Sequence, residues 1–111
     1  MPNSYKIAGQ AAPAANTDTD LYVVPAAKSF VGSSIVICNR NTAGVNSKFR
    51  IAVVPNGESL ANKHYLAYDQ FVPDRDSVTK TIGMSLATGD KVVVRSDSTD
   101  LSFTLFGSEV S

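Results

Sequence analysis

The stretch LSFTLFGSE, residues 101–109, alternates apolar and polar side chains with a period of two. In a β-strand, successive side chains point to opposite faces of the sheet. Leu101, Phe103 and Leu105 are therefore expected to share a buried face, with Ser102 and Thr104 facing outward. This pattern predicts a strand that covers a core with one face.

The same rhythm recurs from Leu21 onward. In KFRIAVVP, residues 48–55, the side chains of Phe49, Ile51 and Val53 fall on one face. Other short runs of this character are LYVVP (21–25), SFVGSSIVICNR (29–40), HYLAYDQFVP (64–73), SVTKTIG (77–83) and DKVVVRS (90–96). Seven or eight short strands joined by turn-rich loops predict an all-β fold, an antiparallel β-sandwich or a jelly-roll-like barrel.

Two segments call for closer attention. The apolar run from Ile35 to Cys38 predicts a strand that is covered on both faces, with the thiol as a small buried hydrophobe. A reactive cysteine would instead require a positive, partly exposed setting. ESLANKHYLAYD, residues 58–69, is compatible with a strand but also with two or three helical turns.

The N-terminal region differs in composition from the rest of the chain. AGQAAPAANTDTD, residues 8–20, contains small residues and Pro13 but no large side chain to bury. We expect either an extended arm that lies across a neighbour or a loose terminus. The predicted organisation is an N-terminal strand and extended arm over residues 1–20 and a β-sandwich domain over residues 21–111.

Composition argues against several classes of function. Ten basic and ten acidic side chains balance, and the basic ones are scattered along the chain, so we expect no nucleic-acid binding. One cysteine cannot form an intrachain disulfide. The first ten residues lack a signal-peptide apolar run, and about 18 consecutive apolar residues occur nowhere, so we expect synthesis in a cytoplasm and no membrane partner.

The single histidine is the first candidate for chemistry. His64, Asp69 and one of the many serines could in principle form a nucleophilic triad, but no G-x-S-x-G elbow is present. If Tyr65 to Tyr68 form a strand, His64 shares a face with Leu66 and Tyr68, while Asp69 lies on the opposite face. We therefore expect a structural or interface histidine, no catalytic residue and no enzymatic activity.

Metal and cofactor sites are not indicated either. Asp18 and Asp20, and likewise Asp74 and Asp76, are spaced two apart, as in calcium loops. Neither pair continues into the glycine and late glutamate of such a loop, so turn residues are expected. No glycine-rich loop has phosphate-binding spacing. Aromatic residues occur about once per strand, which predicts a core-filling role, with some tyrosines on an assembly surface.

Seven phrases together carry a family resemblance: YKIAGQAAPA, TDLYVVPAAKS, SSIVICNR, FRIAV, KHYLAYD, TIGMSLATGDKVVVR and LSFTLFGSEV. In order and spacing the chain resembles small β-rich virion structural proteins of tailed bacteriophages. The resemblance implies a capsid decoration (cement) protein that stabilises the assembled head by binding between capsid subunits. The alternatives are a neck or tail fibre or collar component, and a tail-tip carbohydrate- or receptor-binding module that uses Tyr65 or Tyr68.

The resemblance also implies partners and a location. The expected partners are the major capsid protein or other virion proteins and further copies of the chain, with a trimer favoured, and the expected location is the virion. Residues 1–20 are expected to make partner contacts, and an unpaired strand edge could pair with a neighbour. The loops NRNTAGVNS (39–47) and VPDRDS (72–77) are expected to form exposed ends.

Overall fold

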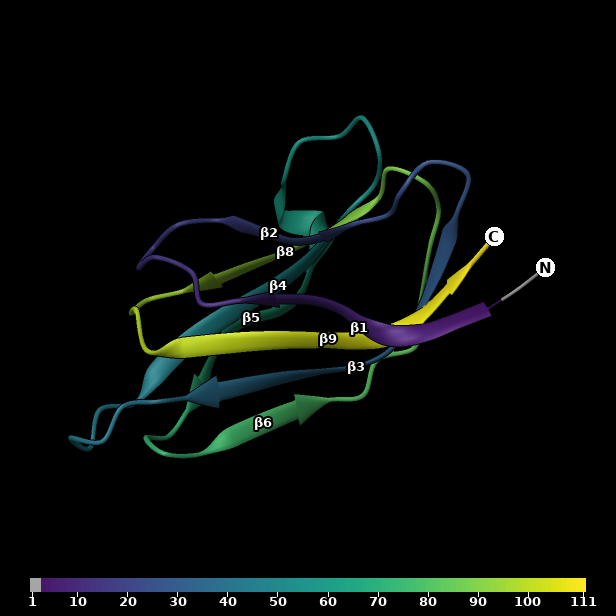
Figure 1. Ribbon diagram of the computed structural model, residues 1–111. Helices are drawn as coiled ribbons and strands as arrows, with labels where there is room; N and C mark the ends of the chain where they lie inside the picture. The colour runs from purple at the N-terminus through teal and green to yellow at the C-terminus, as the bar shows by residue number, and fades with distance from the viewer. Residues whose placement is uncertain (1–2) are drawn as a thin grey trace.

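A computed structural model describes residues 3–111 of the chain, and these residues form a two-layer β-sandwich (Figure 1). The elements are β1 (Asn3–Ala11), β2 (Thr19–Val23), β3 (Ser29–Asn39), β4 (Ser47–Val54), the 3₁₀ turn η1 (Asn62–His64), β5 (Tyr65–Val72), β6 (Ser77–Lys80), β7 (Met84–Leu86), β8 (Lys91–Ser96) and β9 (Leu101–Val110). One sheet has the order β1-β9-β3-β6, with β7 also paired to β3, and the other has the order β2-β8-β4-β5. All pairs are antiparallel, so the predicted all-β antiparallel sandwich is confirmed. The described residues form nine strands, however, and not the seven or eight expected.

The hydrophobic core lies between the two sheets. The five-stranded sheet contributes Phe30, Ile35, Ile37, Leu101, Phe103 and Leu105, all fully buried. The four-stranded sheet contributes Phe49, Ile51, Val92 and Val94, of which Phe49 meets Phe103 edge-on with 6.3 Å between ring centroids. The inward positions expected in β4 and β9 are therefore confirmed.

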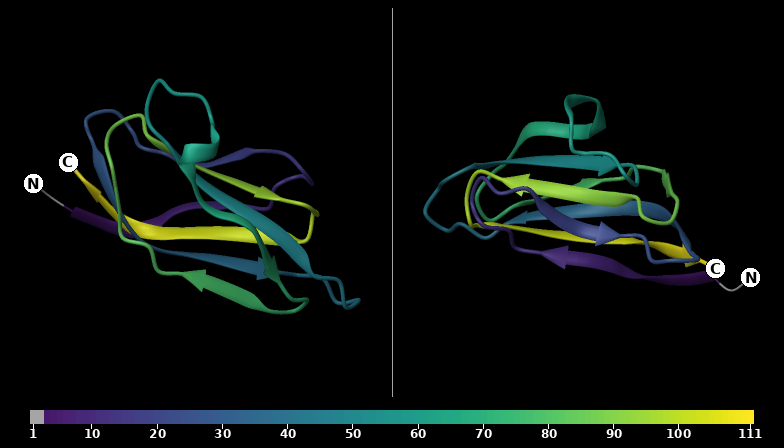
Figure 2. Two further views of the ribbon diagram at one scale, coloured as in Figure 1. Left: turned by 180° about the vertical axis from the view of Figure 1, so that it is seen from behind. Right: turned by 90° about the horizontal axis from the view of Figure 1, so that it is seen from above.

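A smaller apolar cluster lies on the outer side of the four-stranded sheet. Ala52, Val54 and Val93 are buried there, with Leu60 and Tyr65 packed against them. The loop of residues 55–64, which carries η1, covers these side chains and projects from the sandwich in Figure 2. Val93 is thus buried although it points away from the main core, because this loop replaces solvent on the outer face.

The run from Ile35 to Cys38 differs from its prediction. Ile35 and Ile37 are fully buried, but Val36 and Cys38 are only half-buried. These two residues face outward from β3 opposite Thr104 and Ser102 of β9, and the described part of the chain forms no third layer over this face. The prediction of a strand covered on both faces was therefore wrong, because an apolar run does not reveal how many layers the fold has.

The segment around His64 also differs. His64 ends η1, and only this single 3₁₀ turn replaces the longer helix that was considered. The strand β5 follows, but Asp69 has a φ of 53° and the register with β4 shifts between Phe49 and Ile51. The predicted sharing of a face by His64, Leu66 and Tyr68 was wrong, because His64 is buried before the strand begins while Leu66 and Tyr68 are exposed.

The N-terminal strand belongs to the sandwich. β1 pairs with β9 from Asn3 to Ala11, with a register shift between Ile7 and Gly9. Residues 12–18 then cross to the other sheet, where the backbone amide of Asn16 donates to the Ser96 carbonyl at 2.7 Å. The predicted division at residue 20 stays a prediction, but the described part of residues 1–20 supplies an edge strand and the crossing between sheets.

Candidate functional site

A groove lies on the outer face of the five-stranded sheet, over β9 and between β1 and β3. Its volume is about 480 Å³. Its lining comes from Tyr5, Lys6 and Ile7 of β1, Val31 and Ser33 of β3, and Phe106, Gly107 and Ser108 of β9. We call this feature the β9 groove. A hollow of this size is large enough for one or two side chains of a partner.

The register of the sheet explains the groove. Ser108 lies opposite Tyr5 on one side and Val31 on the other, so that a small side chain stands between two large ones. Tyr5 is 83% exposed and Val31 is 50% exposed, whereas Ser108 is only 7% exposed. These three residues form the walls and the floor, and Phe106 on β9 borders the same hollow.

Among the side chains described, those of residues 4–111, the Ser108 hydroxyl is the single buried polar atom without a hydrogen-bond partner. Buried polar groups in folded proteins are almost always hydrogen-bonded, and leaving one unpaired costs about 1–3 kcal/mol. This hydroxyl is on the floor of the β9 groove, where an incoming group could satisfy it.

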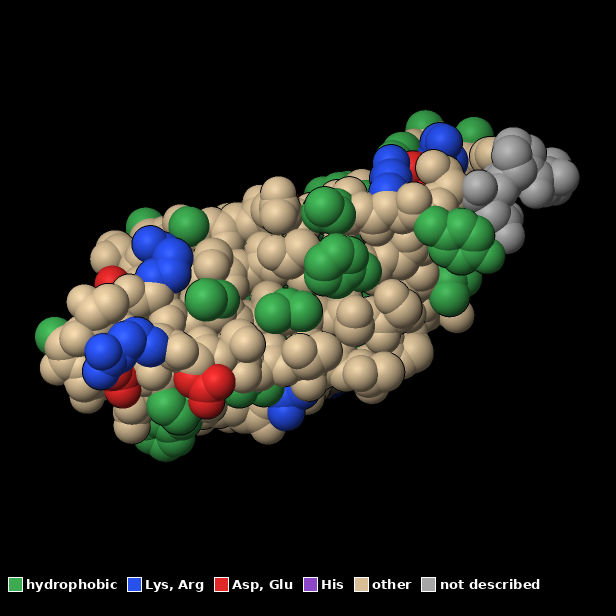
Figure 3. Space-filling model, turned by 60° about the horizontal axis from the view of Figure 1, so that its bottom comes forward, with side chains coloured by type: hydrophobic (Ala, Val, Ile, Leu, Met, Phe, Trp, Pro, Cys, Tyr) green, Lys and Arg blue, Asp and Glu red, His purple; other side chains and the backbone are tan. Residues whose placement is uncertain are grey.

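The outer face around the groove carries few charges. Its further outward positions are Thr104 and Ser102 on β9 and Val36 and Cys38 on β3, which are opposite each other in the register. Figure 3 shows this side of the molecule, with hydrophobic side chains spread along its middle and most charged side chains toward its two ends. A surface with few charges and with exposed apolar side chains is a feature of protein contact surfaces.

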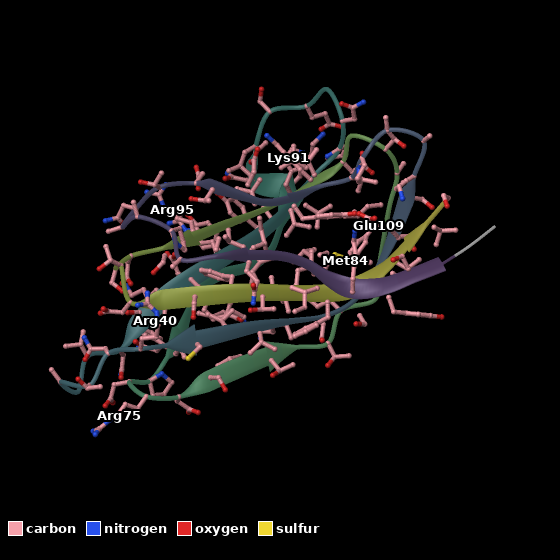
Figure 4. The ribbon with its side chains drawn as sticks, viewed as in Figure 1. Arg40, Arg75, Met84, Lys91, Arg95 and Glu109 are labelled. Atoms are coloured by element: carbon pink, nitrogen blue, oxygen red, sulfur yellow. The ribbon has the colours of Figure 1, made fainter. Side chains whose placement is uncertain are left out.

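Glu109 is the buried charge nearest to the groove, at the end of the sandwich where both termini lie (Figure 4). Its carboxylate is 2.7 Å from the Lys6 ammonium and accepts a hydrogen bond from the Tyr22 hydroxyl at 2.5 Å. The Lys6 contact and then the Tyr22 hydrogen bond lower the pKa of Glu109 below its usual range. Burial, together with Glu109, raises the pKa of Tyr22. Lys6 therefore points to Glu109, and the cluster ties β1 and β9 to β2.

A second surface lies on the outer face of the four-stranded sheet. The Arg50 guanidinium is 4.1 Å from the Tyr68 ring centroid and 2.7 Å from the Asp69 carboxylate. The hydrogen bond from Arg50 lowers the pKa of Asp69. Tyr65 meets Tyr68 edge-on at 4.9 Å, and the Lys48 ammonium lies 5.5 Å from the centroid of the exposed Phe71 ring. The aromatic rings of this face are thus already engaged by cations of the same chain.

His64 and Asp69 do not come together. The His64 ring is buried, its Nδ1 accepts a hydrogen bond from the Ala61 backbone amide at 2.9 Å, and its Nε2 lies 3.0 Å from Glu58. Nδ1 must be unprotonated to accept, so Nε2 carries the proton and donates to the carboxylate. The hydrogen bond to His64, followed by that to Lys63, lowers the pKa of Glu58. The histidine thus holds the 55–64 loop in place.

The paired aspartates take part in separate local contacts. Asp18 lies 3.4 Å from Arg95 and Asp20 lies 3.5 Å from Lys91, whereas Asp74 is close to Arg75. Figure 4 labels these three cations in different parts of the molecule. Within residues 3–111 no group of three or more His, Cys, Asp or Glu side chains is arranged to hold a metal ion.

The two loops expected at exposed ends lie side by side at the end opposite the termini (Figure 1). The Arg75 amide donates to the Asn41 carbonyl at 3.1 Å, and the buried Asn39 side chain donates to the carbonyls of Val45 and Val72. The Arg40 guanidinium donates a hydrogen bond to the Thr99 carbonyl, with 2.6 Å between the nitrogen and the oxygen.

The fold and these surfaces define a β-sandwich with an apolar groove on one face. No protein-family model matches the chain, and no curated protein matches it. None of the described helices is long and apolar enough to cross a membrane. Sequence reasoning missed Ser108, because the signal was only a serine within a strand of large apolar residues. Its burial arises from the two neighbouring strands.

Proposed function

We propose that this chain is a virion structural protein of a tailed bacteriophage, acting as a capsid decoration protein that binds between capsid subunits. The proposal starts from the sequence resemblance of phrases such as SSIVICNR, KHYLAYD and LSFTLFGSEV. The structural observation that supports it best is the outer face of the five-stranded sheet, which carries few charges around the β9 groove. Such a face suits contact with another protein surface.

The proposed mechanism is stabilisation by mass action. A protein that binds the assembled shell but not separate subunits shifts the equilibrium toward the shell, by an amount that grows with occupancy. A compact sandwich suits this role, because its strands bury a continuous core and leave rigid outer faces for contact. The major capsid protein is the expected partner, and the virion is the expected location.

The experiment is to add the purified chain to heads that lack it and to measure occupancy and the temperature at which the heads open. We expect saturable binding at regular positions and a higher opening temperature. An unrelated β-sandwich of similar size and charge is the control. Binding to tails instead of heads, seen by electron microscopy of labelled chain, would favour the neck or tail alternative. Binding to neither would reject both.

The glycan-binding alternative has a specific surface to test. Sugars stack on open aromatic faces, but Arg50 lies over the Tyr68 ring and Tyr65 meets its side. Phe71, 61% exposed, has Lys48 beside it. These contacts favour the assembly function over this alternative. Selective signals on a glycan array that disappear in the Tyr68→Ala variant would support glycan binding instead.

A further inference from the structure

We infer that the β9 groove is an interface between two copies of this chain, in which Tyr5 of each copy enters the groove of the other and meets Ser108. The inference rests on the proposed assembly function and names one of its partners. Its test uses the isolated chain, so a failure here and a failure of head binding can be told apart.

The first step is the requirement that the groove sets for its occupant. The walls are apolar, because Tyr5, Ile7 and Val31 line them. The floor carries the unpartnered Ser108 hydroxyl, which can donate or accept one hydrogen bond. A fitting occupant is therefore a flat apolar side chain with one uncharged polar group at its tip. Lys6, the charged side chain of the lining, is already paired with Glu109, so a charged occupant would lose its hydration without gaining a free counter-ion.

The second step is that the same face carries such a side chain. Tyr5 is 83% exposed, and its phenol has an apolar ring and a hydroxyl at its tip. Its exposed fraction is the highest among the large hydrophobic side chains of the described residues, so its ring has the most surface left to bury. Tyr5 therefore supplies the occupant that the groove of a second copy requires.

The positions of Tyr5 and Ser108 on one face allow a contact that is its own complement. Tyr5 lies directly opposite Ser108 in the register of β1 and β9, so the projecting ring and the groove floor are neighbours on one face. A contact across a two-fold axis must be self-complementary, with residue i touching j and j touching i. Two copies packed face to face can satisfy this condition. The two Tyr5 rings then lie next to each other at the axis, each between the partner's Tyr5 and Val31.

The small number of charges around the β9 groove favours contact between two copies. Two identical surfaces bring like charges together at a two-fold axis, so a charged patch would oppose self-association. The face around the groove avoids this repulsion, because Lys6 is paired with Glu109 and the neighbouring outward positions on β9 and β3 are uncharged. The charged side chains gather mostly at the two ends of this side of the molecule (Figure 3).

The experiment is sedimentation equilibrium of the purified chain across a concentration series, with circular dichroism to check each variant's fold. We expect a monomer–dimer equilibrium. Tyr5→Ser should raise the dissociation constant at least about tenfold, since it removes the central aromatic side chain. Tyr5→Phe should raise it roughly two- to tenfold, the effect of one net hydrogen bond. Ser108→Leu should abolish the dimer by filling the groove.

The matched control is Phe71→Ser, which removes an exposed aromatic side chain from the outer face of the other sheet. This variant should dimerise like the parent chain. Should Ser108→Leu fail to fold, Val31→Lys places a charge on the groove wall at a half-exposed position and should also give monomers. A monomeric parent chain, a trimer, or a dimer whose dissociation constant is unchanged by Tyr5→Ser and Val31→Lys would overturn the inference.

Discussion

The Tyr22 hydroxyl on β2 donates a hydrogen bond to the buried carboxylate of Glu109 on β9, with 2.5 Å between the oxygen atoms. The two residues are 87 positions apart in the chain and belong to different sheets. Lys6 holds the other oxygen of the same carboxylate at 2.7 Å. One acidic side chain thereby connects the first two strands of the chain to the last.

Tyr22→Phe should lower the free energy of unfolding by about 2 kcal/mol, because it removes a buried hydrogen bond to a charged acceptor while keeping the ring. Urea denaturation followed by circular dichroism measures this change. Tyr68→Phe is the control, since Tyr68 is 55% exposed and its ring contact with Arg50 remains. Equal stability of Tyr22→Phe and the parent chain would show that the Glu109 contact does not stabilise the fold.

Stability should fall in acid partly because of Glu109. The pKa of its carboxyl is lowered in the folded state from an ordinary value of 4.5, so the unfolded state takes up the proton first. The stabilisation is present above pH 4.5 and is lost as the pH falls below it through the folded-state pKa. The carboxyls of Glu58 and Asp69, whose pKa values are also lowered, contribute in the same direction.

The measurement is urea denaturation between pH 3 and 7 for the parent chain and for Glu109→Gln. The variant should be less stable at pH 7 and should lose less stability on acidification than the parent chain. A parallel pH dependence in both proteins would assign the acid sensitivity to the other two carboxyls.

Gly107→Ala should destabilise the fold by about 1–3 kcal/mol, as expected for overpacking. A Cβ at this position would overlap the ring of Phe30 and the carbonyl oxygen of Val31. Gly83→Ala is the matched control, because nothing lies within 4 Å of its Cβ and its φ is not positive. Thermal unfolding compares the two variants, and similar melting temperatures would contradict the close packing of β9 on β3.

His64→Ala should destabilise the protein by about 1–3 kcal/mol, because the Ala61 amide loses its hydrogen-bond acceptor and a buried ring is removed. Lys63→Ala should have a smaller effect, since Lys63 is exposed and its contact with Glu58 is a surface ion pair. Limited proteolysis of the 55–64 loop together with urea denaturation measures both. If the His64→Ala variant shows the same proteolysis of this loop and the same stability as the parent chain, His64 does not hold the loop in place.

Several features could be predicted from local sequence. The inward set of β9 and the inward face of β4 follow from side-chain alternation. The loops at 39–47 and 72–77 were also recognisable from their Asn, Gly and Pro content. These features depend on neighbours within a few residues, so a short window of sequence contains the necessary information.

Other features required the tertiary structure. The bulge at Asp69 and the 3₁₀ turn at His64 broke the alternation that the sequence implied, because long-range pairing with β4 and the covering of Val93 decided the local backbone. Asp69 forms an ion pair with Arg50, and His64 forms a hydrogen bond with Glu58. The register of two paired strands decides which side chains contact each other across them. The spacing of apolar residues within one strand does not predict that register.

By itself the sequence determined that the chain buries one face of each of several strands, because alternation is a property of each strand alone. Only the tertiary structure decided that β1 pairs with β9, that nothing in residues 3–111 covers Val36 and Cys38, and that Ser108 stands between Tyr5 and Val31. The physical reason is that a groove and its unpaired hydroxyl arise from three strands brought together by folding.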